Sequence, residues 1–142
     1  MKRILVGVDG SAHADRAICV AAKLSKVSGA DLTLLAVRSL SQALESGDDG
    51  SSTEDGRNVV VDLRPSFLAR AREKVTLAGA PGVETAAAVG DPAEEIANAA
   101  SRRHADIIVV GRRGRGRVTS LMFGSVSQKT IQLAGCPVMI VP

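Results

Sequence analysis

Short apolar runs recur along the chain and predict the strands of a sheet. There are five of them: Ile4–Val8, Asp31–Val37, Val83–Val89, Asp106–Val110 and Val138–Val141. The second and fourth runs are almost unbroken rather than alternating, which is typical of strands that are buried on both faces of a parallel sheet.

Apolar residues at helical spacing occupy most of the intervals between these runs. The expected helices are Ala12–Val27, Ser66–Ala78, a helix opened by Asp91-Pro92, and Val126–Ala134. Strands that alternate with helices through short connections predict an α/β fold. We therefore expect residues 1–142 to form a single-domain, three-layer sandwich, a parallel sheet with helices on both faces.

Residues 39–58 differ from the rest of the chain because they are rich in serine, glycine and acidic residues. This composition predicts a long mobile acidic loop. Pro65 would break any helix already running from Asn58, so the next helix is expected to start after it.

Composition narrows the class of protein. Apolar residues make up 45% of the 142 residues, but Phe67 and Phe123 are the only aromatic ones, so the core must be aliphatic. The chain lacks the aromatic platforms of single-stranded nucleic acid binders, and its net charge of +3 is modest, so a nucleic acid partner is not expected.

Cys19 and Cys136 lack metal-ligand spacing with the histidines, which favours reduced thiols. Without a signal peptide or a membrane-spanning run, we expect a soluble, cytoplasmic protein.

Glycines and arginines alternate directly after the fourth apolar run. The glycines are Gly111, Gly114 and Gly116, the arginines are Arg112, Arg113, Arg115 and Arg117, and the pair Gly124-Ser125 precedes the last helix. Glycine lets backbone N–H groups approach phosphate oxygens, and a helix N-terminus favours an anion. The two glycine segments together predict a cradle for a phosphate chain.

Two generic phosphate motifs do not fit. Gly111 to Val118 has the spacing of a Walker A loop, but Arg117 replaces the lysine and Val118 replaces the magnesium-binding serine or threonine. The local order G-x-x-G-x-G also differs from the G-x-G-x-x-G of a dinucleotide-binding fold.

Gly111, Gly114, Gly124 and Ser125 have the spacing G-x2-G-x9-G-S, which resembles the nucleotide-binding signature of the ATP-binding branch of the universal stress protein family. The opening I-L-V-G-V-D-G-S and the segments V-G-D-P-A-E-E-I and A-D-I-I-V-V-G are similar to the same family's first strand, third helix and fourth strand. The resemblance implies the strand order 3-2-1-4-5 and dimers formed through Val138–Val141.

The resemblance also implies which residues hold ATP. Gly7, Asp9 and Val37 would surround the adenosine. The phosphates would lie on Gly111, Arg112, Gly114, Arg115, Gly116, Gly124, Ser125, Val126 and Ser127. Magnesium or manganese would be held chiefly by phosphates and water, because the sequence offers no carboxylate cage. Arg112 and Arg113 lie between Gly111 and Gly114, and they make this part of the motif more basic than expected for the family.

Each of these residues also has a purely structural interpretation. Asp9 could cap a turn, Ser125 and Gln128 could form a capping box, and His13 and His104 fit a first-turn surface position and a helix C-terminus. None of these interpretations explains why both glycine segments flank one strand and one helix start.

Three functions are compatible with the sequence. The first is a dimeric, ATP-binding universal stress protein that acts as a nucleotide-responsive regulatory or protective module. The second is a slow ATPase or a nucleotidyl or phosphoryl transferase, for which Asp9 is the only acid near the site. The third is a nucleotide-free interaction protein whose arginines bind an anionic partner.

Overall fold

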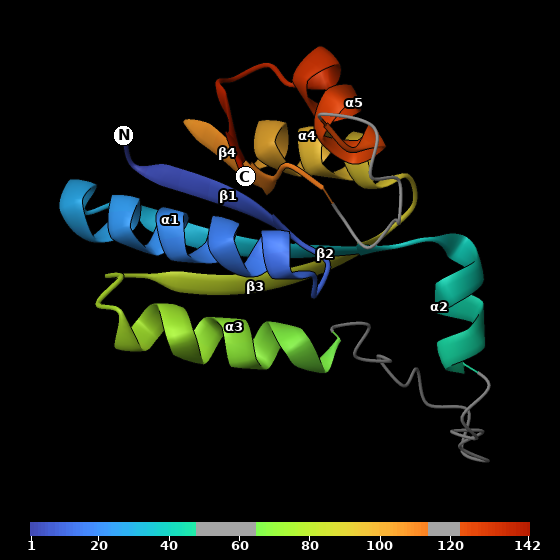
Figure 1. Ribbon diagram of the computed structural model, residues 1–142, viewed down its shortest axis with the longest axis horizontal. Helices are drawn as coiled ribbons and strands as arrows, with labels where there is room; N and C mark the ends of the chain where they lie inside the picture. Colours follow the sequence, from blue (N-terminus) through green and yellow to red (C-terminus); the bar gives the residue numbers. More distant parts are fainter. Residues whose placement is uncertain (48–64, 114–122) are drawn as a thin grey trace.

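A five-stranded parallel sheet lies between two layers of helices in the computed structural model, which describes residues 1–47, 65–113 and 123–142 (Figure 1). The strands are β1 Arg3–Val8, β2 Asp31–Arg38, β3 Val83–Val89, β4 Ile107–Gly111 and β5 Val138–Val141. Their order is β3-β2-β1-β4-β5 and every neighbouring pair is parallel. The predicted fold class and strand order are confirmed.

Four helices cover the sheet and a fifth stands beside it. They are α1 Ala12–Ser28, α2 Leu40–Gly47, α3 Ser66–Leu77, α4 Pro92–Arg102 and α5 Ser125–Leu133. Figure 1 shows α1 and α3 on one face of the sheet, α4 and α5 on the other, and α2 projecting past the end of β2.

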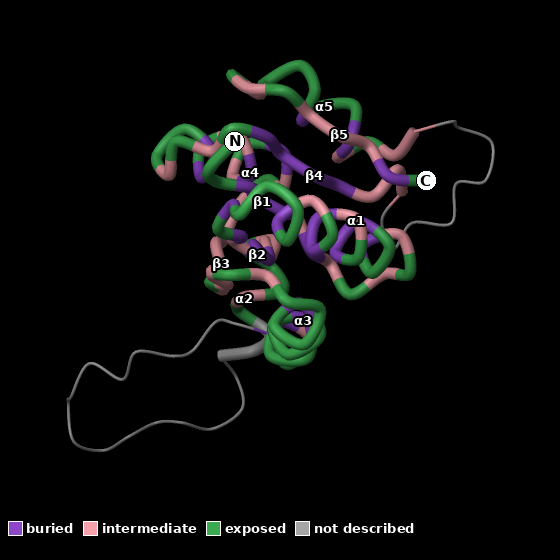
Figure 2. The backbone as a smooth tube through the Cα atoms, turned by 90° about the vertical axis from the view of Figure 1, so that its left-hand side faces the viewer, coloured by how far each residue is buried: buried purple, intermediate pink, exposed green. Residues whose placement is uncertain are grey.

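Two aliphatic clusters fill the space between these layers. Ile4, Val6 and Val8 of β1 join the cluster under α1 and α3, whereas Leu5 joins the cluster under α4 and α5. Successive side chains of a strand point to opposite faces, so a strand covered on both faces must be apolar throughout. Figure 2 shows the buried residues gathered on β4 and on the inner side of α1.

Local hydrogen bonds explain where α1 and α4 begin. The Ser11 hydroxyl accepts a bond from Ala14 N at 3.2 Å, and Asp91 Oδ2 accepts one from Glu94 N at 3.1 Å. Gly29, at φ 72°, ends α1 in the left-handed conformation that glycine adopts most easily. The cap at Asp91 agrees with the helix predicted to open at Asp91-Pro92.

One prediction is wrong: the loop expected over residues 39–58 begins instead with helix α2 over Leu40–Gly47. Ser39 and Gln42 form a capping box, because Gln42 Oε1 accepts from Ser39 N at 3.0 Å and Ser39 Oγ accepts from Gln42 N at 3.3 Å. Residues 48–58 lie outside the described residues.

None of the helices in the described ranges is both long enough and apolar enough to cross a membrane.

Candidate functional site

The winding of the sheet reverses between β1 and β4, and the candidate site lies at that point. β1 pairs with β2 on one side and with β4 on the other. The connections therefore leave the carboxyl ends of β1 and β4 in opposite directions, which opens a crevice where ligands bind in folds of this kind. Asp9 follows β1 at this edge, and β4 ends at Gly111.

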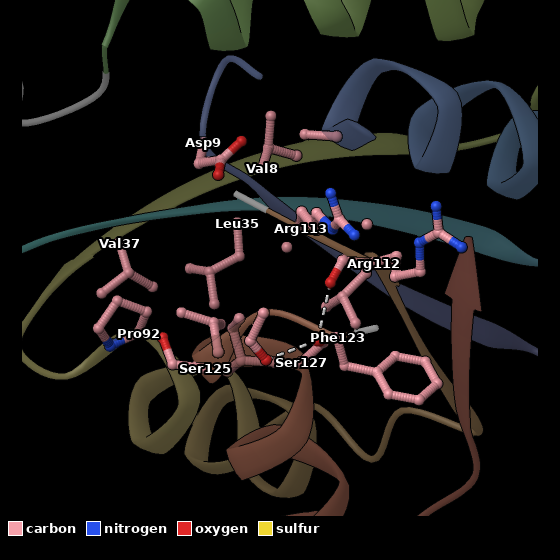
Figure 3. A pocket seen from close by; sticks show the side chains of 17 residues that line it. Val8, Asp9, Leu35, Val37, Pro92, Arg112, Arg113, Phe123, Ser125 and Ser127 are labelled. Atoms are coloured by element: carbon pink, nitrogen blue, oxygen red, sulfur yellow. Dashed lines mark hydrogen bonds between the residues drawn. The ribbon is translucent and has the colours of Figure 1, made fainter. Parts of the chain in front are cut away.

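A cavity of about 310 Å³ occupies the crevice (Figure 3). Its described lining comes from β1, α1, β2, α4, the end of β4 and the start of α5, together with the residues that adjoin them: Gly7, Val8, Asp9, Ala14, Leu35, Val37, Pro92, Ile96, Val110, Gly111, Arg112, Arg113, Phe123, Gly124, Ser125, Val126 and Ser127. The cavity has one apolar end and one polar end.

The apolar end lies between β2 and α4, where Leu35, Val37, Pro92 and Ile96 line it (Figure 3). Gly7 forms its floor: a Cβ atom at this position would come within 2.9 Å of Ile96 Cδ1 and 3.1 Å of Val110 Cγ1. A larger residue at position 7 would push into the space between the sheet and α4.

The polar end is built around the backbone of Arg112. Arg112 N donates to Val141 O at 2.7 Å, and Arg112 O accepts from Gly124 N at 2.8 Å and from Ser127 Oγ at 3.0 Å. Ser127 is buried, and its hydroxyl also lies 2.9 Å from Gly124 O. These bonds hold the start of α5 against the end of β4 and β5.

The first turn of α5 opens into the cavity. Gly124 is the N-cap residue, and the helix has no side-chain capping bond among the described residues. The first N–H groups of a helix have no partner within the helix, and they lie at the positive end of its dipole. With Arg112 and Arg113 beside them, these groups form a site that favours an anion.

The capping box expected from Ser125 and Gln128 does not form. Ser125 is already the first residue of α5, one position too late to cap it, and Gln128 N bonds to Gly124 O at 3.1 Å. The Ser125 side chain is exposed at the cavity rim and is not needed to start the helix.

Asp9 lines the cavity and also holds the turn before α1. Its Oδ1 accepts a hydrogen bond from Ser11 N at 2.9 Å. Both interpretations of Asp9 from the sequence are therefore compatible with its position. Among the described residues that line the cavity, Asp9 is the only carboxylate, and no metal-binding group of three His, Cys, Asp or Glu occurs in the described ranges.

Gly111 brings β4 against the first turn of α1. A Cβ atom at this position would lie 2.8 Å from the carbonyl carbon of His13. The His13 ring accepts at Nδ1 a hydrogen bond from Arg16 Nη2, 2.9 Å away. Burial lowers the pKa of His13, and the charges of Arg16, Arg112 and Arg113 lower it further.

The structure brings nine of the predicted site residues to this cavity: Gly7, Asp9, Val37, Gly111, Arg112, Gly124, Ser125, Val126 and Ser127. Gly114, Arg115 and Gly116 lie outside the described residues. The lining residues that sequence reasoning missed are Val8, Ala14, Leu35, Pro92, Ile96, Val110 and Phe123. Leu35 could have been found from Val37, because residues two apart on a strand share a face.

Comparison with known proteins places this arrangement in a family. All of residues 1–142 match the model of the Universal stress protein family. Universal stress protein YxiE of Bacillus subtilis is 36% identical over 145 residues, which cover 98% of this chain and 97% of the relative. A universal stress protein of Mycobacterium tuberculosis is 31% identical over 142 residues, or 99% and 95% of the two chains.

Solved structures share the fold along its whole length. UspA from Lactobacillus plantarum has a TM-score of 0.80 at 23% identity and covers 99% of this chain and 97% of its own. A universal stress protein in complex with cAMP has a TM-score of 0.72 at 24% identity over 99% and 94%. One from Archaeoglobus fulgidus in complex with dAMP has a TM-score of 0.68 at 23% identity over 100% and 98%. The resemblance seen in the sequence is thus confirmed along the whole chain, which belongs to the universal stress protein family.

Proposed function

We propose that this protein binds an adenine nucleotide, with ATP as the expected ligand, and acts as a dimeric, nucleotide-responsive regulatory or protective module. The observation that carries the proposal is the division of one cavity into an apolar end and an anion-favouring end. Its apolar end suits a planar base, and its polar end combines a helix N-terminus with two arginines. Two universal stress proteins of the same fold are described in complex with cAMP and dAMP, which supports an adenine nucleotide as the ligand class.

The residues present fit a nucleotide in this orientation. Leu35, Val37, Pro92 and Ile96 would contact the base, and Gly7 leaves room for it beside α4. The phosphates would accept bonds from the N–H groups at the start of α5. A divalent cation would be held mainly by the phosphates and water, because Asp9 is the only carboxylate among the described lining residues.

The dimer is expected at β5. This strand is at the edge of the sheet, β4 is its only partner among the described strands, and Val138, Met139 and Ile140 are partly exposed. An apolar edge strand is an association hazard unless another strand or chain covers it. A second copy related by a two-fold axis would cover both edges at once.

The test of nucleotide binding is an equilibrium titration of nucleotide-stripped protein with ATP and with adenosine, on the parent chain and on Ser125→Asp. A carboxylate at the first position of α5 favours the helix but repels phosphate. We expect the substitution to weaken ATP binding at least about tenfold and to leave adenosine binding nearly unchanged.

Ser66→Asp is the matched control, because Ser66 is the exposed first residue of α3 and is not among the residues that line the cavity. It should leave both titrations unchanged. Absence of ATP binding by the parent chain would refute the proposal. Equal loss of ATP and adenosine binding in Ser125→Asp would refute the assignment of the polar end to phosphate.

A further inference from the structure

His13 lies at the meeting point of three segments that are far apart in the sequence. It belongs to the first turn of α1, and its backbone lies against Gly111 at the end of β4. Arg112 and Arg113 follow Gly111 directly and line the cavity. His13 itself is not among the residues that line the cavity, so it stands just behind the polar end.

Arg16 fixes the protonation state of the His13 ring. The guanidinium of Arg16 is a donor only, so the ring nitrogen Nδ1, 2.9 Å from Arg16 Nη2, must be the acceptor. The neutral ring then carries its proton on Nε2. Arg16 is held in place by a second bond, from its Nε to Pro142 O at 2.7 Å.

The charges that face His13 are mostly positive. Burial disfavours the imidazolium most, Arg16 on α1 and Arg112 and Arg113 after β4 disfavour it further, and Asp9 in the β1–α1 turn favours it. The N-terminal end of α1 also disfavours a cation. A bound phosphate would counter the part of this effect that comes from the arginine charges.

We propose that His13 couples phosphate binding in the cavity to pH, by taking up a proton from solvent at Nδ1 when the phosphates of a nucleotide neutralise Arg112 and Arg113. The Arg16–His13 hydrogen bond opens in this step, while Arg16 keeps its bond to Pro142. The inference rests on the proposed function, because it requires phosphate at the polar end of the cavity.

The direction of the effect follows from linkage. If the bound state holds the proton more tightly than the free state, lowering the pH strengthens nucleotide binding. The gain is complete below the pKa of His13 in the free protein and is lost above its pKa in the complex. We expect neutralisation of the Arg112 and Arg113 charges to give about a tenfold difference in nucleotide affinity between about pH 8 and about pH 5.5.

The chain has only two histidines, so each imidazole can be followed separately. The imidazole resonances of His13 and His104 are followed by NMR against pH, without ligand, with ATP and with inorganic tripolyphosphate. His104 follows α4 and precedes β4, so it lies at the opposite edge of the sheet from the cavity. We expect ligand to move the titration midpoint of His13 upward, and the His104 resonances serve as the internal reference.

Two substitutions distinguish protonation of His13 from protonation of the terminal phosphate, which titrates in the same pH range. The ATP affinity of His13→Gln should change less with pH than that of the parent chain. The ATP affinity of His104→Gln should change with pH as much as that of the parent chain. Arg16→Gln should move the His13 midpoint upward even without ligand, because it removes one cation and one donor.

The outcomes distinguish this inference from the proposed function. ATP binding with an unmoved His13 midpoint, or with unchanged pH dependence in a folded His13→Gln, overturns the inference and leaves nucleotide binding intact. Failure of both ATP and tripolyphosphate to bind overturns both proposals. A shift caused by tripolyphosphate, together with no binding of ATP, supports the coupling and overturns the adenine nucleotide as ligand.

Discussion

Gly111 shows how one residue positions two elements of the site. It ends β4, lines the cavity and carries no side chain where the first turn of α1 passes. The nearest atoms to a Cβ atom built there belong to the backbone and Cβ of His13, at 2.8 to 2.9 Å. Backbone atoms cannot turn aside as the end of a long side chain can, so the contact requires glycine.

We therefore expect Gly111→Ala to destabilise the protein by about 1–3 kcal/mol, the usual cost of overpacking. The measurement is urea unfolding followed by circular dichroism. Gly135→Ala is the control, because no atom lies within 4 Å of a Cβ atom built there, and it should change stability by less than about 0.5 kcal/mol. Equal stability of the two variants would contradict the proposed contact.

Asp91 gives a prediction about pH. The hydrogen bond from Glu94 N and then that from Lys129 hold the pKa of Asp91 below its ordinary value. The resulting stabilisation is present above the pKa of an unfolded aspartate, about 3.9, and is lost as pH falls through the lower folded-state pKa. Asp91→Asn keeps a capping side chain but loses the charge.

This variant should melt at a lower temperature than the parent chain at about pH 7, and the difference should shrink toward zero at about pH 2. Thermal unfolding at the two pH values is the measurement. A difference of the same size at both would show that the carboxylate charge contributes nothing.

At the residue level, motifs predicted the part of the site that depends on backbone. Gly111, Gly124 and Ser125 could be assigned because phosphate cradles need glycine and helix starts at fixed spacing. Pro92 and Ile96 could not, since they line the cavity only because α4 packs across the ends of β1 and β2. Such a contact is set by the arrangement of the elements and leaves no local pattern.

Among the elements, α2 shows that a capping box can favour a helix where the composition predicts a loop. Its sequence is polar, and two of its large apolar residues, Leu40 and Leu44, are 65% and 68% exposed. Its helical start depends on the reciprocal bonds of Ser39 and Gln42. A short helix with little packing draws its stability from such local bonds.

Ser39→Ala should therefore reduce hydrogen-exchange protection within α2 and change global stability by less than about 0.5 kcal/mol. Ser11→Ala is the contrasting variant. Ser11 caps α1, which packs on the core, so its loss should lower global stability by about 1 kcal/mol. A global loss of similar size in both variants would mean that α2 unfolds together with the sheet.

The ends of the predicted strands and helices lie within one residue of the observed ones. β3 and β5 have the predicted bounds, β1 and β2 differ from theirs by one residue at one end, and β4 differs by one residue at both ends. Continuous apolar runs have clear limits where charged residues and glycine begin. The missed helix α2 has apolar residues at helical spacing, Leu40, Ala43 and Leu44, but this pattern covers little more than one turn, and the capping box at Ser39 and Gln42 was the other signal for it.

Strand order is a property of the whole molecule and did not follow from periodicity. The apolar runs are compatible with several orders, and only the family resemblance implied 3-2-1-4-5. That order sets β1 beside β4 and so creates the cavity.

Nucleotide binding should stabilise the whole fold, because the cavity is assembled from β1, β2, α4 and α5 together. Saturation at about 100 times the dissociation constant should raise the free energy of unfolding by about 2.7 kcal/mol. Val37→Asp, which puts a charge at the apolar end, should remove this increment. Val27→Asp should retain it, because Val27 is 88% exposed at the end of α1. Full retention by Val37→Asp would place the base elsewhere.

The end of the chain is bonded to the polar end of the cavity through Arg112 and to α1 through Arg16. Arg112 N bonds to Val141 O, and Arg16 Nε bonds to Pro142 O, each at 2.7 Å. A backbone hydrogen bond therefore connects the edge strand β5 directly to the polar end of the cavity. If two copies associate through β5, each equilibrium must influence the other to the same extent.

The expected consequence is that nucleotide affinity depends on protein concentration. Diluting the protein until dimers separate should weaken nucleotide binding, and saturating it with nucleotide should shift dimer dissociation to lower concentration by the same factor. Sedimentation with and without ATP, paired with titrations at two protein concentrations, would measure both factors. The fraction of protein with bound nucleotide would then depend on the protein concentration as well as on the nucleotide concentration.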